Sequence, residues 1–165
     1  MVRLEASHFP LVLLDLGGSD RTPDEFRAAF ADFHDVNRRS KAEGKRWVLV
    51  AVTESPPNAI ERKIIAEESN KFSAEDQRLC AASVLVIPNS IIRSVVTALG
   101  WMLQTMSPLV PAPTTAAAVD LAVERLRAIG IDCTLEEAGH ARRWFQQNES
   151  MTNLRASAGG KKAAR

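Results

Sequence analysis

Ser83-Val84-Leu85-Val86-Ile87 leads through Pro88-Asn89-Ser90 into an apolar helical stretch that ends near Met106, and this passage decides the fold. The mostly β-branched run predicts a buried strand, and the turn after it supplies the start of a helix. The helical stretch is apolar on more than one face. Its apolar residues are Ile91, Ile92, Val95, Val96, Leu99, Trp101, Met102, Leu103 and Met106. We expect a strand–helix unit of an α/β domain, with the helix covered by the sheet and by a second element.

Strands and helices alternate on both sides of this passage. Continuous apolar runs predict buried strands at 10–16 and 47–52, in addition to 83–87. A short edge strand is expected at 2–6. A second one is expected within the proline-rich stretch 107–113, because proline is tolerated at a sheet edge. Helical patterns fill 22–44, 59–71, 91–106, 115–129 and 134–148. The chain is therefore predicted to be α/β, with one mainly parallel sheet of four to five strands, crossover helices and an extra C-terminal helix.

Capping signals mark where the helices begin and end. Thr22 is expected to cap the first helix, with Pro23 at its first position and Glu25 closing a capping box. Gly44 is a good terminator for that helix. In the helix from residue 59, we expect Ile60, Ile64 and Ile65 to face inward, among charged residues that include Glu61.

The chain is long enough for one domain with a substantial core. We assign 1–130 to the α/β domain, 131–148 to an accessory C-terminal helix, and 149–165 to a disordered tail of low hydrophobicity.

Composition narrows the class of protein. The 165 residues are 45% hydrophobic and 25% charged, with a net charge of +1, which predicts no attraction to nucleic acid. No apolar run reaches the length of a membrane span. Only two cysteines are present, which favours a reducing compartment, and we expect a bacterial cytoplasmic protein.

Residue patterns for chemistry are weak, so no catalytic residue, cofactor or metal is predicted. His8, His34 and His140 lack a second ligand at the spacing that metal sites favour. Cys80 lies near an apolar segment, where a buried structural thiol is commoner than a nucleophile. The glycine turn at 17–20 lacks the pattern of a phosphate-binding loop.

Four segments resemble the STAS domain, the small α/β domain of anti-sigma-factor antagonists, and in particular its bacterial relatives of unassigned function. The resemblance covers roughly residues 9–128 and lies in the order of the segments and in their pattern of apolar and polar residues. The segments are Phe9-Pro10-Leu11-Val12-Leu13-Leu14 before a Thr-Pro-Asp-Glu-Phe helix start, Trp47-Val48-Leu49-Val50-Ala51-Val52 before a polar loop, Val84-Leu85-Val86-Ile87-Pro88-Asn89 with the following Ile92-to-Trp101 stretch, and the Pro-rich turn before Thr115–Leu126.

The resemblance implies regulation by protein contact. In antagonists of this family, a serine or threonine at the start of the helix after a central strand is phosphorylated. The matching positions are Thr53 and Ser55, although Pro56-Pro57 stands where the family has glycine. A phosphate there would meet free helix amides. A serine that only serves the turn is the commoner role of such a residue.

Two helices are candidates for an interface with a second subunit or a protein partner, or for packing against each other within the chain. The candidate interface residues are Ile92, Val96, Leu99, Trp101, Met102, Met106, Trp144 and Phe145.

Three functions remain open. The leading hypothesis is a non-enzymatic regulatory protein-interaction module, which we expect to self-associate as a homodimer. A small apolar-ligand-binding protein would instead require an apolar pocket between the sheet and the helices. An unrecognised enzyme would require Asp15, Glu54 and Ser55 to converge at one sheet edge.

Overall fold

A computed structural model describes the chain except at residues 19, 56, 88–106 and 160–165, and the side chains of 149–159 are also left aside. Of the strand–helix unit expected at 83–106, the strand is described, whereas the expected apolar helix, residues 91–106, lies outside the described residues.

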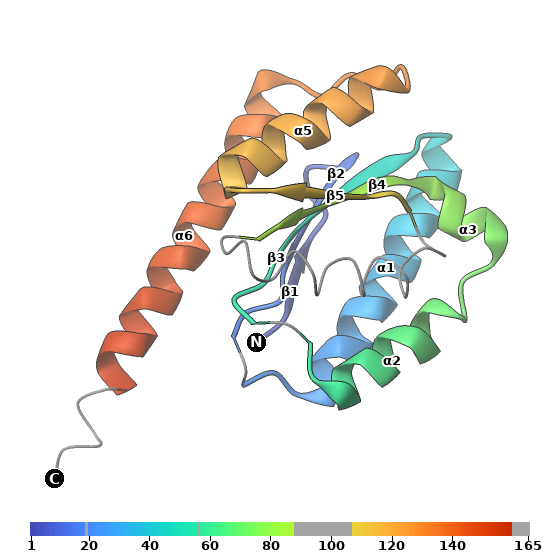
Figure 1. Cartoon of the computed structure of the whole chain (residues 1–165). Helices are drawn as coiled ribbons and strands as arrows, with labels where there is room; N and C mark the ends of the chain where they lie inside the picture. The colour runs from blue at the N-terminus through green and yellow to red at the C-terminus, as the bar shows by residue number, and fades with distance from the viewer. Residues whose placement is uncertain (19, 56, 88–106, 160–165) are drawn as a thin grey trace, which may run out of the picture.

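Five strands form one mixed sheet in the order β1-β2-β3-β4-β5 (Figure 1). They are β1 (Arg3–Glu5), β2 (Leu11–Asp15), β3 (Trp47–Val52), β4 (Cys80–Val86) and β5 (Leu109–Ala112). The pair β1–β2 is antiparallel and the other three pairs are parallel. The expected α/β class, the mainly parallel sheet and the upper strand number are thus confirmed.

Helices cover both faces of the sheet (Figure 1). One face carries α1 (Pro23–Glu43), α2 (Ala59–Ser69) and the short α3 (Ala74–Leu79). The other carries α5 (Thr115–Ala128) and the first half of α6 (Leu135–Gly159). Because the strands follow one another in chain order across the sheet, right-handed crossovers place α1, α2 and α3 on the same face.

The central strands send alternate side chains into two separate cores. On β2, Val12 and Leu14 join the core under α1 and α2, whereas Leu11 and Leu13 join the core under α5 and α6. This two-sided burial explains why the strands read as unbroken apolar runs in the sequence. The core under α1 also holds a hydrogen-bonded polar pair, in which Trp47 Nε1 donates to Asn37 Oδ1 at 3.0 Å.

The expected helix ends are mostly confirmed. Thr22 and Glu25 form the capping box of α1, and Gly44 ends that helix in the left-handed conformation, with φ of 64°. Two boundaries differ. Strand β4 begins at Cys80 rather than at Ser83, and α6 continues past Asn148 to Gly159.

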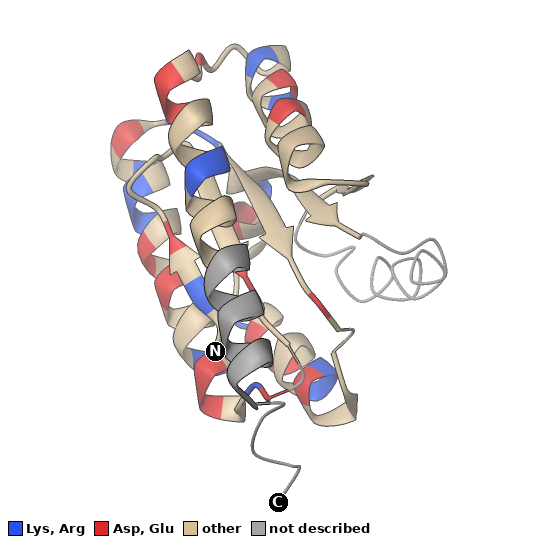
Figure 2. Cartoon of the chain, turned by 90° about the vertical axis from the view of Figure 1, so that its left-hand side faces the viewer, with Lys and Arg blue, Asp and Glu red and all other residues tan. Residues whose placement is uncertain are grey.

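Charges are distributed without a dominant sign. Figure 2 shows acidic and basic residues interspersed along the helices, while strands β3, β4 and β5 carry no charged residue. No helix in the described part of the chain has the length and apolar character needed to cross a membrane.

Candidate functional site

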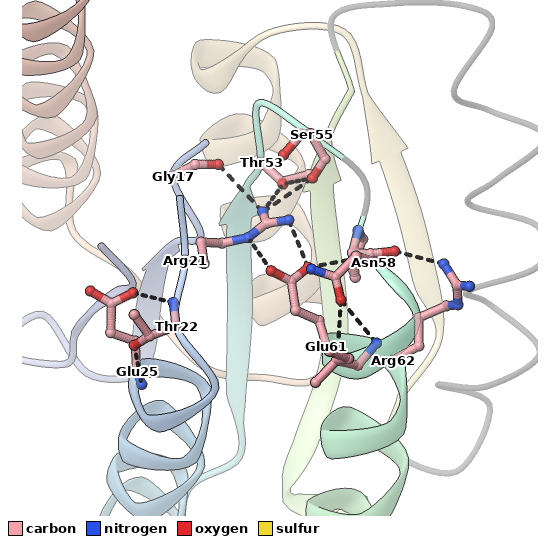
Figure 3. Close-up of polar contacts among 11 residues, drawn as sticks. Gly17, Arg21, Thr22, Glu25, Thr53, Ser55, Asn58, Glu61 and Arg62 are labelled. Atoms are coloured by element: carbon pink, nitrogen blue, oxygen red, sulfur yellow. Dashed lines mark hydrogen bonds and ion pairs between the residues drawn. The ribbon is translucent and has the colours of Figure 1, made fainter. Parts of the chain in front are cut away.

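In parallel α/β sheets, binding and catalytic sites lie at the carboxyl ends of the strands. In this protein, a buried ion pair occupies that edge of the sheet. Arg21, in the loop between β2 and α1, pairs with Glu61 in the first turn of α2 (Figure 3). The Arg21 Nη2 and Nε atoms lie 2.9 Å and 3.1 Å from the two Glu61 carboxylate oxygens. The two side chains are only 1% and 2% exposed, so the contact is a bidentate pair shielded from water.

The other guanidinium nitrogen joins both loops at this edge. Arg21 Nη1 donates to the Thr53 hydroxyl at 3.0 Å, to the Ser55 carbonyl at 3.1 Å and to the Gly17 carbonyl at 3.4 Å. Glu61 in turn accepts from the backbone N–H of Asn58, the N-cap residue of α2, at 2.8 Å. We call these six residues the carboxyl-edge network. It ties the β2–α1 loop, the β3–α2 loop and the start of α2 together (Figure 3).

Neither charged member of this network is predicted from the sequence. Ile60 is expected to face inward with Glu61 among the charged residues around it, but Glu61 is buried and Ile60 is 64% exposed. This inward assignment of Ile60 is wrong, because the capping box turns Glu61 back toward the N-cap and the buried Arg21. An Asn58-x-x-Glu61 pattern was the signal available in the sequence.

The two phospho-switch candidates lie inside or beside this network. The Thr53 hydroxyl accepts from Arg21 and donates to the Ser55 carbonyl at 2.6 Å, so its hydrogen-bonding capacity is used. The Ser55 hydroxyl oxygen is buried, with no hydrogen-bond partner among the described residues. Both hydroxyls are therefore turned away from solvent in this conformation.

The residues of the enzyme hypothesis do not converge. An Asp15 carboxylate oxygen accepts from the Gly17 N–H at 2.8 Å and so serves the turn after β2. Glu54 is exposed, and no hydrogen bond joins it to Asp15 or Ser55 within the described residues. Asp15, Glu54 and Ser55 therefore form no hydrogen-bonded acid–base pair with one another among the described residues.

The two cysteines are buried, and their thiols are poorly suited to nucleophilic chemistry. Burial raises the pKa of the Cys80 thiol. Burial, assisted by the nearby Glu137 carboxylate, raises the pKa of Cys133 to about 11. Within the described residues, no group of three or more His, Cys, Asp or Glu side chains is arranged to hold a metal ion.

The candidate interface residues fall into two groups. Ile92, Val96, Leu99, Trp101, Met102 and Met106 lie outside the described residues. On α6, Phe145 is buried in the core under α5 and α6, and Trp144 is half-buried against it in an edge-on arrangement with ring centroids 5.0 Å apart.

The second candidate site is an apolar cavity of about 110 Å³ between the sheet and α1. Its walls come from four strands, from α1 and α2 and from the β3–α2 loop. Among the described residues they comprise Leu14, Leu16, Phe26, Ala29, Phe30, Phe33, Trp47, Leu49, Ala51, Thr53, Pro57, Ile65, Cys80, Ser83, Val84, Leu85, Ser107 and Leu109. The carboxyl-edge network borders this cavity, because Thr53 lines it and the Arg21 guanidinium lies 5.6 Å from the ring of Phe26.

Comparison of the chain with protein-family models, with curated proteins and with solved structures found no match. The carboxyl-edge network and the apolar cavity are therefore the two features of the described structure from which a function can be inferred.

The carboxyl-edge network predicts a large stability loss when one charge is removed. Glu61→Gln leaves the buried Arg21 guanidinium without its counter-charge, and we expect the free energy of unfolding to fall by about 3–5 kcal/mol. Urea unfolding measures this change. Lys63→Gln on the same helix is the control: it breaks the exposed Lys63–Glu67 pair and should cost less than about 0.5 kcal/mol. Equal small effects of the two variants would contradict a structural role for the network.

The raised pKa of Cys133 predicts a pH dependence of stability. The folded protein holds the thiol proton more tightly than the unfolded chain, so the contribution is complete below a pH of about 9 and is lost as the pH rises toward 11. We expect wild type to lose more stability over this interval than Cys133→Ala, since every other titrating group is common to both. Denaturant unfolding at several pH values tests this, and parallel curves for the two proteins would refute it.

Proposed function

We propose that this chain is a non-enzymatic binding protein that holds a small apolar ligand between its sheet and helix α1. The observation that carries the proposal is the cavity of about 110 Å³ with predominantly apolar walls. Cavities of roughly this size in protein cores stay dry and bind xenon or benzene. Well-packed cores hold few voids of this size, because each removes van der Waals contacts.

The carboxyl-edge network supports the same proposal. Arg21, Glu61 and the Thr53 hydroxyl, which an α/β enzyme could present at this edge, are engaged with one another and with backbone groups in the carboxyl-edge network. Ligand binding in the apolar interior requires no reactive group and leaves that network intact.

Xenon binding and cavity filling test the proposal. Xenon should shift the amide resonances of residues that line the cavity, such as Leu14, Phe30 and Leu85. Ala29→Leu extends a lining side chain into the space and should abolish these shifts at little cost in stability. Ala122→Leu makes the same change in α5, on the opposite face, where Ala122 is fully buried and does not line the apolar cavity. It should retain xenon binding and cost about 1–3 kcal/mol through overpacking.

Absence of any xenon effect in the wild-type protein would defeat the proposal.

The second candidate function is a self-associating regulatory interaction module, in keeping with the STAS-like resemblance, which we retain as a proposal. The observation that favours it is the length of α6. Its first half supplies Ala138, Ala141 and Phe145 to the core, but its backbone continues to Gly159 and extends away from the sheet (Figure 1). A helix that projects from a domain offers a surface for a second subunit.

Sedimentation tests this second candidate. At micromolar concentrations we expect the full chain to be a dimer, and a chain ending at Asn148 to be a monomer, because the truncation removes only the projecting half of α6. The truncated chain keeps the buried α6 residues, so unfolding experiments should show that its core is intact. A full chain that stays monomeric over the same concentrations would rule the module out as a homodimer.

A further inference from the structure

Aromatic side chains form one wall of the apolar cavity. Phe26, Phe30 and Phe33 of α1 and Trp47 of β3 all line it. Phe33 stacks on Trp47 with ring centroids 5.8 Å apart, and Phe30 meets Phe33 edge-on at 5.9 Å. A further ring placed against this wall gains edge-to-face or offset-stacked contacts, which favour an aromatic ligand over a saturated one of equal size.

The polar side chains that line the cavity already have partners in the protein. The Thr53 hydroxyl is held by Arg21 and the Ser55 carbonyl. Across the cavity, the hydroxyls of Ser83 and Ser107 are hydrogen-bonded to each other at 2.6 Å. The Cys80 thiol donates to the Ala82 carbonyl at 3.4 Å. A hydroxyl or amine on a ligand would have to displace one of these contacts or remain unpaired.

Size sets the remaining limit. The cavity of about 110 Å³ is somewhat smaller than engineered cavities of roughly 150 Å³ that accept benzene. One aromatic ring therefore approaches the upper limit of the space that the described walls leave.

We infer that the cavity selects a single-ring aromatic hydrocarbon and rejects ring compounds that carry a hydrogen-bonding group. This inference rests on the proposed apolar-ligand function and specifies its ligand class. The aromatic wall favours the ring, and the internally paired polar side chains disfavour a polar substituent.

Three probes of similar size test the class: benzene, cyclohexane and phenol, each titrated into the full chain and followed by amide chemical shifts. We expect benzene to bind most tightly. Phenol should bind roughly tenfold or more weakly, because its hydroxyl loses water without gaining a partner. Cyclohexane should bind more weakly than benzene by about twofold to tenfold, since it lacks the ring–ring contacts.

One substitution should alter the selectivity without filling the cavity. Ser83→Ala removes the closer partner of the Ser107 hydroxyl, which keeps its contact with the Cys80 thiol and gains capacity to pair with a ligand at the wall. Phenol should then gain affinity relative to benzene by at least about threefold, while benzene itself changes little. Ser7→Ala, an exposed serine between β1 and β2 that does not line the cavity, is the control and should leave the ratio unchanged.

The outcomes separate this inference from the proposed function. If xenon binds but benzene, cyclohexane and phenol bind equally well, the ligand class is wrong and the apolar-ligand function stands. If xenon and all three compounds fail to bind, both are wrong. If benzene is preferred but Ser83→Ala leaves the phenol ratio unchanged, the account of polar rejection is overturned.

Discussion

Strands β2, β3 and β4 bury side chains on both faces, and this constraint determines the arrangement of everything around them. On β3, Val48 and Val50 enter one core while Trp47 and Ala51 enter the other, so neither face can be left to water. Right-handed crossovers place α1, α2 and α3 together on one face. The opposite face then needs a cover from further along the chain, and α5 and the first half of α6 supply it.

Placing three crossover elements on one face concentrates their loops at the carboxyl edge of the sheet. The loops after β2 and β3 meet there, and Arg21 satisfies their carbonyls while Glu61 compensates its charge. Burying two charges is costly unless both are paired and fully hydrogen-bonded, and this pair meets that condition. The edge at which many α/β proteins carry out chemistry is used here to hold three segments in register.

The strands and most helix ends could be predicted from the sequence because both depend on local patterns of residues. Apolar runs marked β2, β3 and most of β4, and the capping residues Thr22 and Gly44 marked the ends of α1. The carboxyl-edge network could not be found in this way, since Arg21 and Glu61 are 40 residues apart and their pairing depends on the crossover geometry. Helical periodicity placed Ile60 inside, but the first turn of α2 is oriented by its cap and by Arg21. The cavity could not be predicted from the sequence either, because it depends on how the apolar side chains pack in three dimensions and not on their order along the chain.

The network and the cavity differ in how completely their contacts are satisfied. At the carboxyl edge, carbonyls, a hydroxyl and both charges find partners within about 3.4 Å, so a ligand there would have to compete with the protein itself. In the cavity, by contrast, Phe30, Leu85 and their neighbours have apolar surface that other described residues leave without close contacts. Unfilled apolar surface can be stabilised by a ligand at no cost to existing hydrogen bonds. A ligand of the proposed kind would therefore draw its binding free energy from the interior between the sheet and α1, rather than from the edge where fold class alone would place a site.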